Sequence, residues 1–194
     1  MSALTVRHDP EQGWDELVRL WEEMEWPEGC KVEIIDGNIT VSPAPAYQHN
    51  LIAARIQRRL YSVIPEEWEI FQTQAIAVPS RMGMLIPDLL VAPSQEDVES
   101  DSHIPAALAE LVVEITSKSN AVHDRISKCA AYAAAGIPFY LLVDRWSPVG
   151  PVATLYGEPT GDVYRPLSVV KFGDPLQLPA PFGLTIDTGE FPTP

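Results

Sequence analysis

Two acidic residues interrupt apolar segments that have the character of buried strands. Asp88 lies within LIPDLLV, and Glu114 lies within LVVEIT. A carboxylate in a buried strand is costly unless it is paired or bound to a metal. Two such groups on neighbouring strands could hold Mg²⁺ through their oxygen atoms. The ion could polarise a phosphoryl oxygen and activate a bound water, so the pattern predicts a Mg²⁺-dependent phosphodiesterase site. The alternative is that each carboxylate makes a structural salt bridge or lies at an exposed strand end.

Three other residues could assist this chemistry. Asp124 and Lys128 are four residues apart and therefore share one face of an expected helix. A lysine beside the metal could orient the attacking water or offset the charge that builds on the phosphate. His49 begins another expected helix and could bind a phosphate or water, or transfer a proton, because histidine titrates near neutral pH. The alternatives are a solvent-facing ion pair for Asp124 and Lys128 and a structural hydrogen bond for His49.

These residues must be brought together by several elements, which the apolar periodicity and the turn residues predict. The expected helices cover residues 13–26, 47–64 and 121–135. The expected strands cover a hairpin at 31–42, then residues 68–78, 84–92, 111–116 and 139–144. Strand, helix and strand follow one another over 111–144, so a βαβ unit is expected there. Residues 152–194 are expected to add antiparallel strands. The fold class is therefore α/β, a central mixed sheet flanked by helices, with an N-terminal helix and hairpin and extra C-terminal strands.

The composition is that of a globular protein. The chain has 194 residues, 46% hydrophobic and 21% charged, which suits a single domain over residues 1–194 with a core of about 47–144. No apolar run is long enough to span a bilayer, and the N-terminal sequence is unlike a secretory signal, so a cytoplasmic location without membrane contact is expected. The net charge of −14 is unusual for a protein that binds nucleic acid. Either a local basic face exists, or DNA is held weakly, or metal ions supply much of the positive charge.

The order of several short motifs carries a family resemblance. In sequence order they are VEIIDG (32–37), His49, IPDL (86–89), VVEITS (112–117), Asp124, Lys128, Tyr132, AGIP (135–138) and YLLVD (140–144). Together they resemble the Uma-two family of restriction-endonuclease-like proteins, a branch of the PD-(D/E)xK nuclease superfamily. The resemblance covers about Trp14 to Phe182 and implies a restriction-endonuclease-like core.

The resemblance also implies roles for individual residues. Asp88 corresponds to the acid that follows the proline of the motif, and Glu114 corresponds to its second acid. Thr116 stands where the wider superfamily has lysine, and Lys128 on the following helix could take over that role. Glu33 would lie near the metal; on periodicity alone it could equally be an ordinary outward residue of the hairpin.

The sequence thus supports two hypotheses about function. The first is an endonuclease that hydrolyses nucleic acid, with double-stranded DNA as the favoured substrate and Mg²⁺ or Mn²⁺ as cofactor. Its catalytic residues would be Asp88, Glu114, Lys128, Glu33 and His49, of which Asp88, Glu114 and Glu33 would bind the metal. A homodimer would match the two-fold symmetry of duplex DNA. The second hypothesis is a catalytically inactive nuclease-like scaffold that acts as a binding or regulatory module, which the acidic charge and Thr116 favour.

Overall fold

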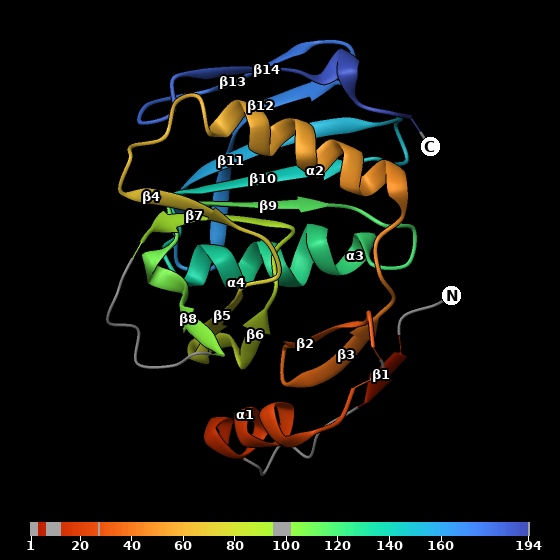
Figure 1. Cartoon of the computed structure of the whole chain (residues 1–194), viewed down its shortest axis with the longest axis vertical. Coiled ribbons are helices and arrows are strands. Elements are labelled where there is room, and N and C mark those ends of the chain that lie inside the picture. Colours follow the sequence, from red (N-terminus) through yellow and green to blue (C-terminus); the bar gives the residue numbers. More distant parts are fainter. Residues whose placement is uncertain (1–3, 7–12, 27, 95–101, 194) are drawn as a thin grey trace.

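Two mixed six-stranded sheets organise the computed structural model, which describes residues 4–6, 13–26, 28–94 and 102–193 (Figure 1). The central sheet has the order β12-β11-β10-β9-β7-β4, and the hairpin sheet has the order β1-β3-β2-β6-β5-β8. The strands of the central sheet are β4 (Trp68–Phe71), β7 (Leu89–Pro93), β9 (Leu111–Ile115), β10 (Phe139–Asp144), β11 (Val152–Thr160) and β12 (Val163–Lys171). Those of the hairpin sheet are β1 (Leu4–Val6), β2 (Lys31–Ile35), β3 (Asn38–Ser42), β5 (Ala75–Val78), β6 (Gly83–Leu85) and β8 (His103–Pro105). The α/β class and the flanking helices are therefore confirmed.

The helices lie on both faces of the central sheet and below the hairpin sheet. They are α1 (Trp14–Glu23), α2 (Tyr47–Leu60), α3 (Ala121–His123) and α4 (Cys129–Ala134), with a π-helical segment (Asp124–Lys128) that joins α3 to α4. Short 3₁₀ turns cover Pro79–Arg81, Ala106–Leu108 and Thr188–Glu190. In Figure 1, α2 crosses one face of the central sheet, α4 crosses the other, and α1 lies beneath the hairpin sheet. No helix of these described ranges is long and apolar enough to cross a membrane.

The middle strands of the central sheet carry apolar side chains on both faces, because a helix covers the sheet on each side. Val113 and Leu141 pack with Ile52 and Ile56 of α2 on one face. Val112 packs with residues of α4 on the other face. Successive side chains of a strand point to opposite faces, so Glu114 shares the α4 face with Val112. Strands β9 and β10 are parallel, as expected for the βαβ unit.

The N-terminal helix and hairpin form a smaller core of their own. The hairpin turns at Asp36 and Gly37, both with positive φ, as its sequence predicted. Leu17 of α1 packs in a cluster with Val32 and Ile34 of β2. This packing fixes the β2 strand from which two side chains of the candidate site project.

Two expected strands are wrong in the same way, since each is split between the two sheets. Residues 68–78 form β4 in the central sheet and β5 in the hairpin sheet, and Thr73 between them has a φ of 61°. Residues 84–92 form β6 in the hairpin sheet and β7 in the central sheet. β4 pairs with β7, and β5 pairs with β6. Residues 68–93 are therefore a two-stranded ribbon that crosses from one sheet to the other, with Pro87, which lacks an N–H, in the crossing.

The C-terminal residues add antiparallel strands, as expected. β11 and β12 extend the central sheet beyond β10, while β13 (Pro175–Leu178) and β14 (Leu184–Asp187) form a separate hairpin. Leu176 and Ile186 of this hairpin belong to the same apolar cluster as Leu60 of α2. The hairpin therefore closes the outer side of α2.

The apolar packing of β10 predicts a large effect on stability. Leu141 is fully buried in the central sheet, so Leu141→Ala should lower the free energy of unfolding by about 2–5 kcal/mol through the cavity it leaves. Val169 on β12 is 61% exposed, and Val169→Ala should cost less than about 1 kcal/mol. Urea unfolding followed by circular dichroism measures both. Equal losses in the two variants would contradict the described core.

Candidate metal-binding active site

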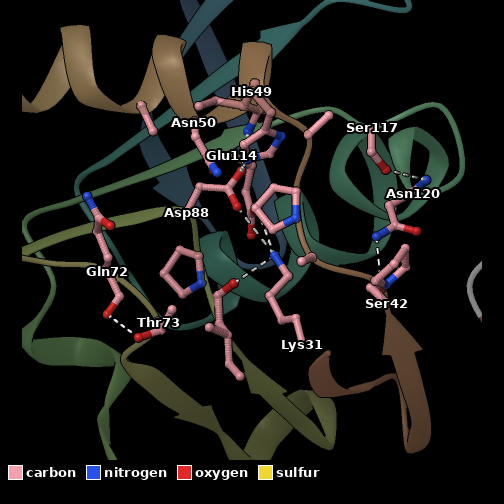
Figure 2. Close-up of a pocket in the computed structure, with 18 of the residues that line it drawn as sticks. Lys31, Ser42, His49, Asn50, Gln72, Thr73, Asp88, Glu114, Ser117 and Asn120 are labelled. Carbon is pink, nitrogen blue, oxygen red and sulfur yellow. Dashed lines mark hydrogen bonds and ion pairs between the residues drawn. The ribbon is translucent and has the colours of Figure 1, made fainter. Parts of the chain in front are cut away.

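A pocket of about 670 Å³ opens where the ribbon crosses between the sheets. Its walls come from the start of β2, the turn before α2, the two crossings of the ribbon and the loop after β9, and they include Lys31, His49, Gln72, Asp88, Glu114 and Asn120. Figure 2 shows Lys31, His49, Asp88 and Glu114 pointing toward one another in the middle of this pocket. The five predicted catalytic residues all lie in one cluster, three of them lining the pocket and Glu33 and Lys128 directly behind it. Asp124, the sixth residue that the sequence singled out, also lines the pocket.

Asp88 ends the crossing between β6 and β7 and is tied to β9. Its N–H donates to the carbonyl of Val113 at 3.1 Å. Its Oδ2 accepts a hydrogen bond of 2.7 Å from the Ile115 N–H and lies 3.0 Å from Nε2 of His49. Burial acts to raise the pKa of Asp88, but the Lys31 ammonium, the His49 hydrogen bond and the Ile115 N–H together bring it below its ordinary value. Asp88 is therefore a fixed, ionised carboxylate.

Glu114 is the last but one residue of β9 and is 1% exposed. Its Oε1 accepts a hydrogen bond of 2.9 Å from Lys128 Nζ and one of 2.6 Å from the Tyr132 hydroxyl. Burial raises the pKa of Glu114 above its ordinary value, and the ammonium groups of Lys128 and Lys31 only partly oppose this. The helix after β9 thus supplies both donors that orient this carboxylate.

Glu33 reaches the same place from the hairpin sheet. Its Oε1 accepts a hydrogen bond of 2.8 Å from the Ile86 N–H in the ribbon crossing and lies 2.8 Å from Lys128 Nζ. Burial acts to raise the pKa of Glu33, but Lys128 and Lys31 outweigh it and the pKa is lowered. Glu33 and Asp88 therefore bind the backbone N–H groups on either side of the site.

Lys128 is buried at the end of the π-helical segment, with 1% exposure. Besides Glu33 and Glu114, its Nζ lies 3.5 Å from Oδ1 of Asp124, so the pair expected from the four-residue spacing forms but faces inward. Burial would lower the pKa of Lys128, but the three carboxylates raise it well above its ordinary value. Burial also raises the pKa of Asp124. Single π-helical turns recur at functional sites, where they change the phase of a helix.

Lys31 is the cluster member that the sequence interpretation missed. Its Nζ donates to the Ile86 carbonyl at 3.1 Å and lies 3.5 Å from Oδ1 of Asp88. The same nitrogen lies 3.9 Å from Oε2 of Glu33 and 4.0 Å from Oε2 of Glu114. Burial would lower the pKa of Lys31, but Glu33, Asp88 and Glu114 outweigh it and raise the pKa. The available signal was the spacing, because residues 31 and 33 of one strand point to the same face.

The carboxylates have a common arrangement around Lys31. In Glu33, Asp88 and Glu114, one oxygen accepts the bonds from fixed donors described above, and the other oxygen faces Lys31 Nζ. Three carboxylate oxygens and one carbonyl oxygen therefore converge on a single point. Oxygen ligands of this kind are those that Mg²⁺ prefers.

The charges and the distances bear on whether a metal fits this point. Four carboxylates meet two ammonium groups in the cluster, which leaves a formal excess of two negative charges when all are ionised. The oxygens stand 3.1–4.0 Å from Lys31 Nζ, whereas a magnesium ion needs them at about 2.1 Å. Within the described ranges, no group of three His, Cys, Asp or Glu side chains is set at metal-binding geometry. The oxygen ligands suit a hard divalent cation once the Lys31 ammonium has moved away from the point where they converge.

Thr116, which stands in the lysine position of the motif, has a structural role. Its hydroxyl donates to Oδ1 of Asp144 at 3.1 Å and accepts a hydrogen bond of 3.0 Å from the Arg145 N–H. Arg125 makes two further bonds to Asp144, of 2.7 and 2.9 Å. Thr116 is therefore part of the contact that holds the helix to the end of β10.

The buried position of Lys128 predicts that its charge is needed for stability. Lys128→Met leaves Glu33 and Glu114 buried with their negative charges less compensated, and should lower the free energy of unfolding by about 3–5 kcal/mol. Lys171 is exposed on β12, and Lys171→Met should change stability by less than about 0.5 kcal/mol. Urea unfolding compares the two variants. A loss as small in Lys128→Met as in the control would rule out the buried bridge.

Comparison with known proteins assigns this architecture to a family. A crystal structure at 1.96 Å resolution of a "putative nuclease belonging to DUF820 from Anabaena variabilis ATCC 29413" is similar in fold, with a TM-score of 0.62 and 18% sequence identity over 93% of this chain and 97% of that one. No curated protein matches the chain significantly. The family model Uma2, described as "Putative restriction endonuclease", matches residues 14–189. Because this match spans most of the sequence, the chain belongs to the Uma2 family.

Proposed function

We propose that this chain is a metal-dependent nuclease that hydrolyses phosphodiester bonds. The observation that carries the proposal is the convergence of three carboxylate oxygens and the Ile86 carbonyl on one point inside a pocket. Membership of the Uma2 family, described as "Putative restriction endonuclease", and a nuclease-like fold support the same activity. Mg²⁺ or Mn²⁺ would be held by Asp88 and Glu114, with Glu33 beside them.

The donors around the site would hold one oxygen of each carboxylate in place and leave the other oxygen to bind the ion. When bound, the ion would activate a water molecule and polarise the phosphoryl oxygen. The Ile115 N–H and His49 hold one oxygen of Asp88, which leaves Oδ1 directed at the cation position. Lys128 holds Glu33 and Glu114 from behind. Its burial favours a positioning role over the contact with water or phosphate that the sequence suggested.

The pocket walls suggest how an acidic protein could accept a phosphate. Apart from Lys31, the described lining contains no lysine or arginine and carries neutral amide side chains, among them Asn50, Gln72 and Asn120. With a net charge of −14, long-range attraction of nucleic acid would be weak, so a bound divalent cation would supply most of the local positive charge. Substrate binding should therefore depend strictly on the bound metal. Double-stranded DNA as substrate, a homodimer, a cytoplasmic location and a single domain over residues 1–194 stay predictions.

A cleavage assay tests the proposed activity. Purified protein should nick plasmid DNA in Mg²⁺ or Mn²⁺ and not in EDTA. Asp88→Asn and Glu114→Gln should each lower the rate by about 100-fold or more, because each removes a charged ligand. Glu69→Gln, at an exposed position of β4, removes the same charge far from the pocket and should leave the rate unchanged. Full activity in Asp88→Asn that folds normally would refute the assignment.

The rival proposal is a nuclease-like scaffold without catalysis, which the ammonium at the cation position and the structural Thr116 favour. Calorimetric titration with Mn²⁺ separates the two proposals. The nuclease should bind Mn²⁺ and lose that binding in Asp88→Asn. Absence of binding in the wild-type protein, with no cleavage in any metal, would favour the scaffold.

A further inference from the structure

Lys31 differs from Lys128 in how firmly its ammonium is held. Lys128 Nζ lies 2.8–2.9 Å from its two nearest carboxylate oxygens, and its side chain is 2% exposed. Lys31 Nζ lies 3.5–4.0 Å from its carboxylate oxygens, and its side chain is 23% exposed. Lys31 also starts its strand at the pocket wall, with Gly29 and Cys30 before it. Lys31 is thus the cation of this cluster that can leave without unpacking the core.

The place that Lys31 fills is also the place that a metal would need. Its Nζ faces the second oxygens of Glu33, Asp88 and Glu114, which the fixed donors leave available. An ammonium and a divalent ion cannot share these oxygens, because both need them and their positive charges repel at such short range. The oxygens must also close in by more than an ångström to reach the distance that Mg²⁺ requires, about 2.1 Å.

We propose that the Lys31 ammonium is a tethered competitor of the divalent cation. In the metal-free protein it compensates the three carboxylates, and metal binding displaces its side chain into the pocket. This inference rests on the proposed function, since it assumes that these carboxylates bind a metal. Metal affinity is then reduced by the fraction of molecules in which Lys31 occupies the cation position.

Calorimetric titration with Mn²⁺ tests the competition directly. Lys31→Met keeps an unbranched side chain, one atom shorter than lysine, and removes the charge, and it should tighten Mn²⁺ binding by about tenfold or more. Lys31→Arg keeps a cation and should bind Mn²⁺ no more tightly than the wild-type protein. Lys118→Met is the matched control, because Lys118 is exposed in the loop between Ser117 and Ser119 of the pocket wall. Its Mn²⁺ affinity should change less than about threefold.

Thermal unfolding gives a second readout that does not depend on activity. In EDTA, Lys31→Met should melt below the wild-type protein, because Glu33, Asp88 and Glu114 lose a compensating charge. Saturating Mn²⁺ should remove or reverse this difference, since the ion replaces the missing charge. Lys31→Gln provides the same two measurements if the methionine variant does not fold.

The outcomes distinguish this inference from the proposed function. If Lys31→Met and Lys31→Gln bind Mn²⁺ as weakly as or more weakly than the wild-type protein, while Asp88→Asn abolishes binding, the competitor role is overturned and the metal site stands. If neither the wild-type protein nor any Lys31 variant binds Mn²⁺, the metal site is overturned and the competitor role with it. Tighter binding confined to the Lys31→Met and Lys31→Gln variants supports both.

Discussion

The buried ammonium of Lys128 is the contact on which the rest of this structure depends. It joins Glu33 of the hairpin sheet to Glu114 of the central sheet, and it belongs to the helix that connects β9 to β10. Charges buried this deeply are tolerated only when they are paired and hydrogen-bonded, so the three elements must meet at this point. The interaction that closes the two sheets against each other therefore also aligns the acidic groups of the pocket.

The acidic groups are held by donors from β9, from α4 and from the ribbon crossing. The backbone N–H groups of Ile86 and Ile115 and the hydroxyl of Tyr132 each fix one carboxylate oxygen. One oxygen of each carboxylate is therefore fixed before any ligand arrives, while the second oxygen can still move toward a cation. The polar backbone of the ribbon crossing also gains partners from the same side chains, which satisfies groups that a central strand would otherwise pair with a neighbour.

The sequence singled out Asp88 and Glu114, which the structure brings together, because a buried charge is conspicuous in an apolar strand. It also predicted the hairpin and the βαβ unit, whose turn residues and apolar runs are local signals. It could not predict the split of residues 68–78 and 84–92, because alternation along a strand is the same whichever sheet the strand joins. Lys31 was missed for a related reason: only the packing of β2 decides which face of that strand is turned toward Glu114.

The ribbon of residues 68–93 has a consequence for how this fold can change in length. Side chains alternate along both of its strands, so one residue inserted or deleted near Pro87 would reverse the faces of either β6 or β7. Asp88 would then turn away from β9 although its own identity was unchanged. Indels can be absorbed at the 3₁₀ turn Pro79–Arg81, where the ribbon folds back, but not at its middle. Relatives of this chain should therefore vary in loop length at the tip of the ribbon and keep a constant spacing across the crossing.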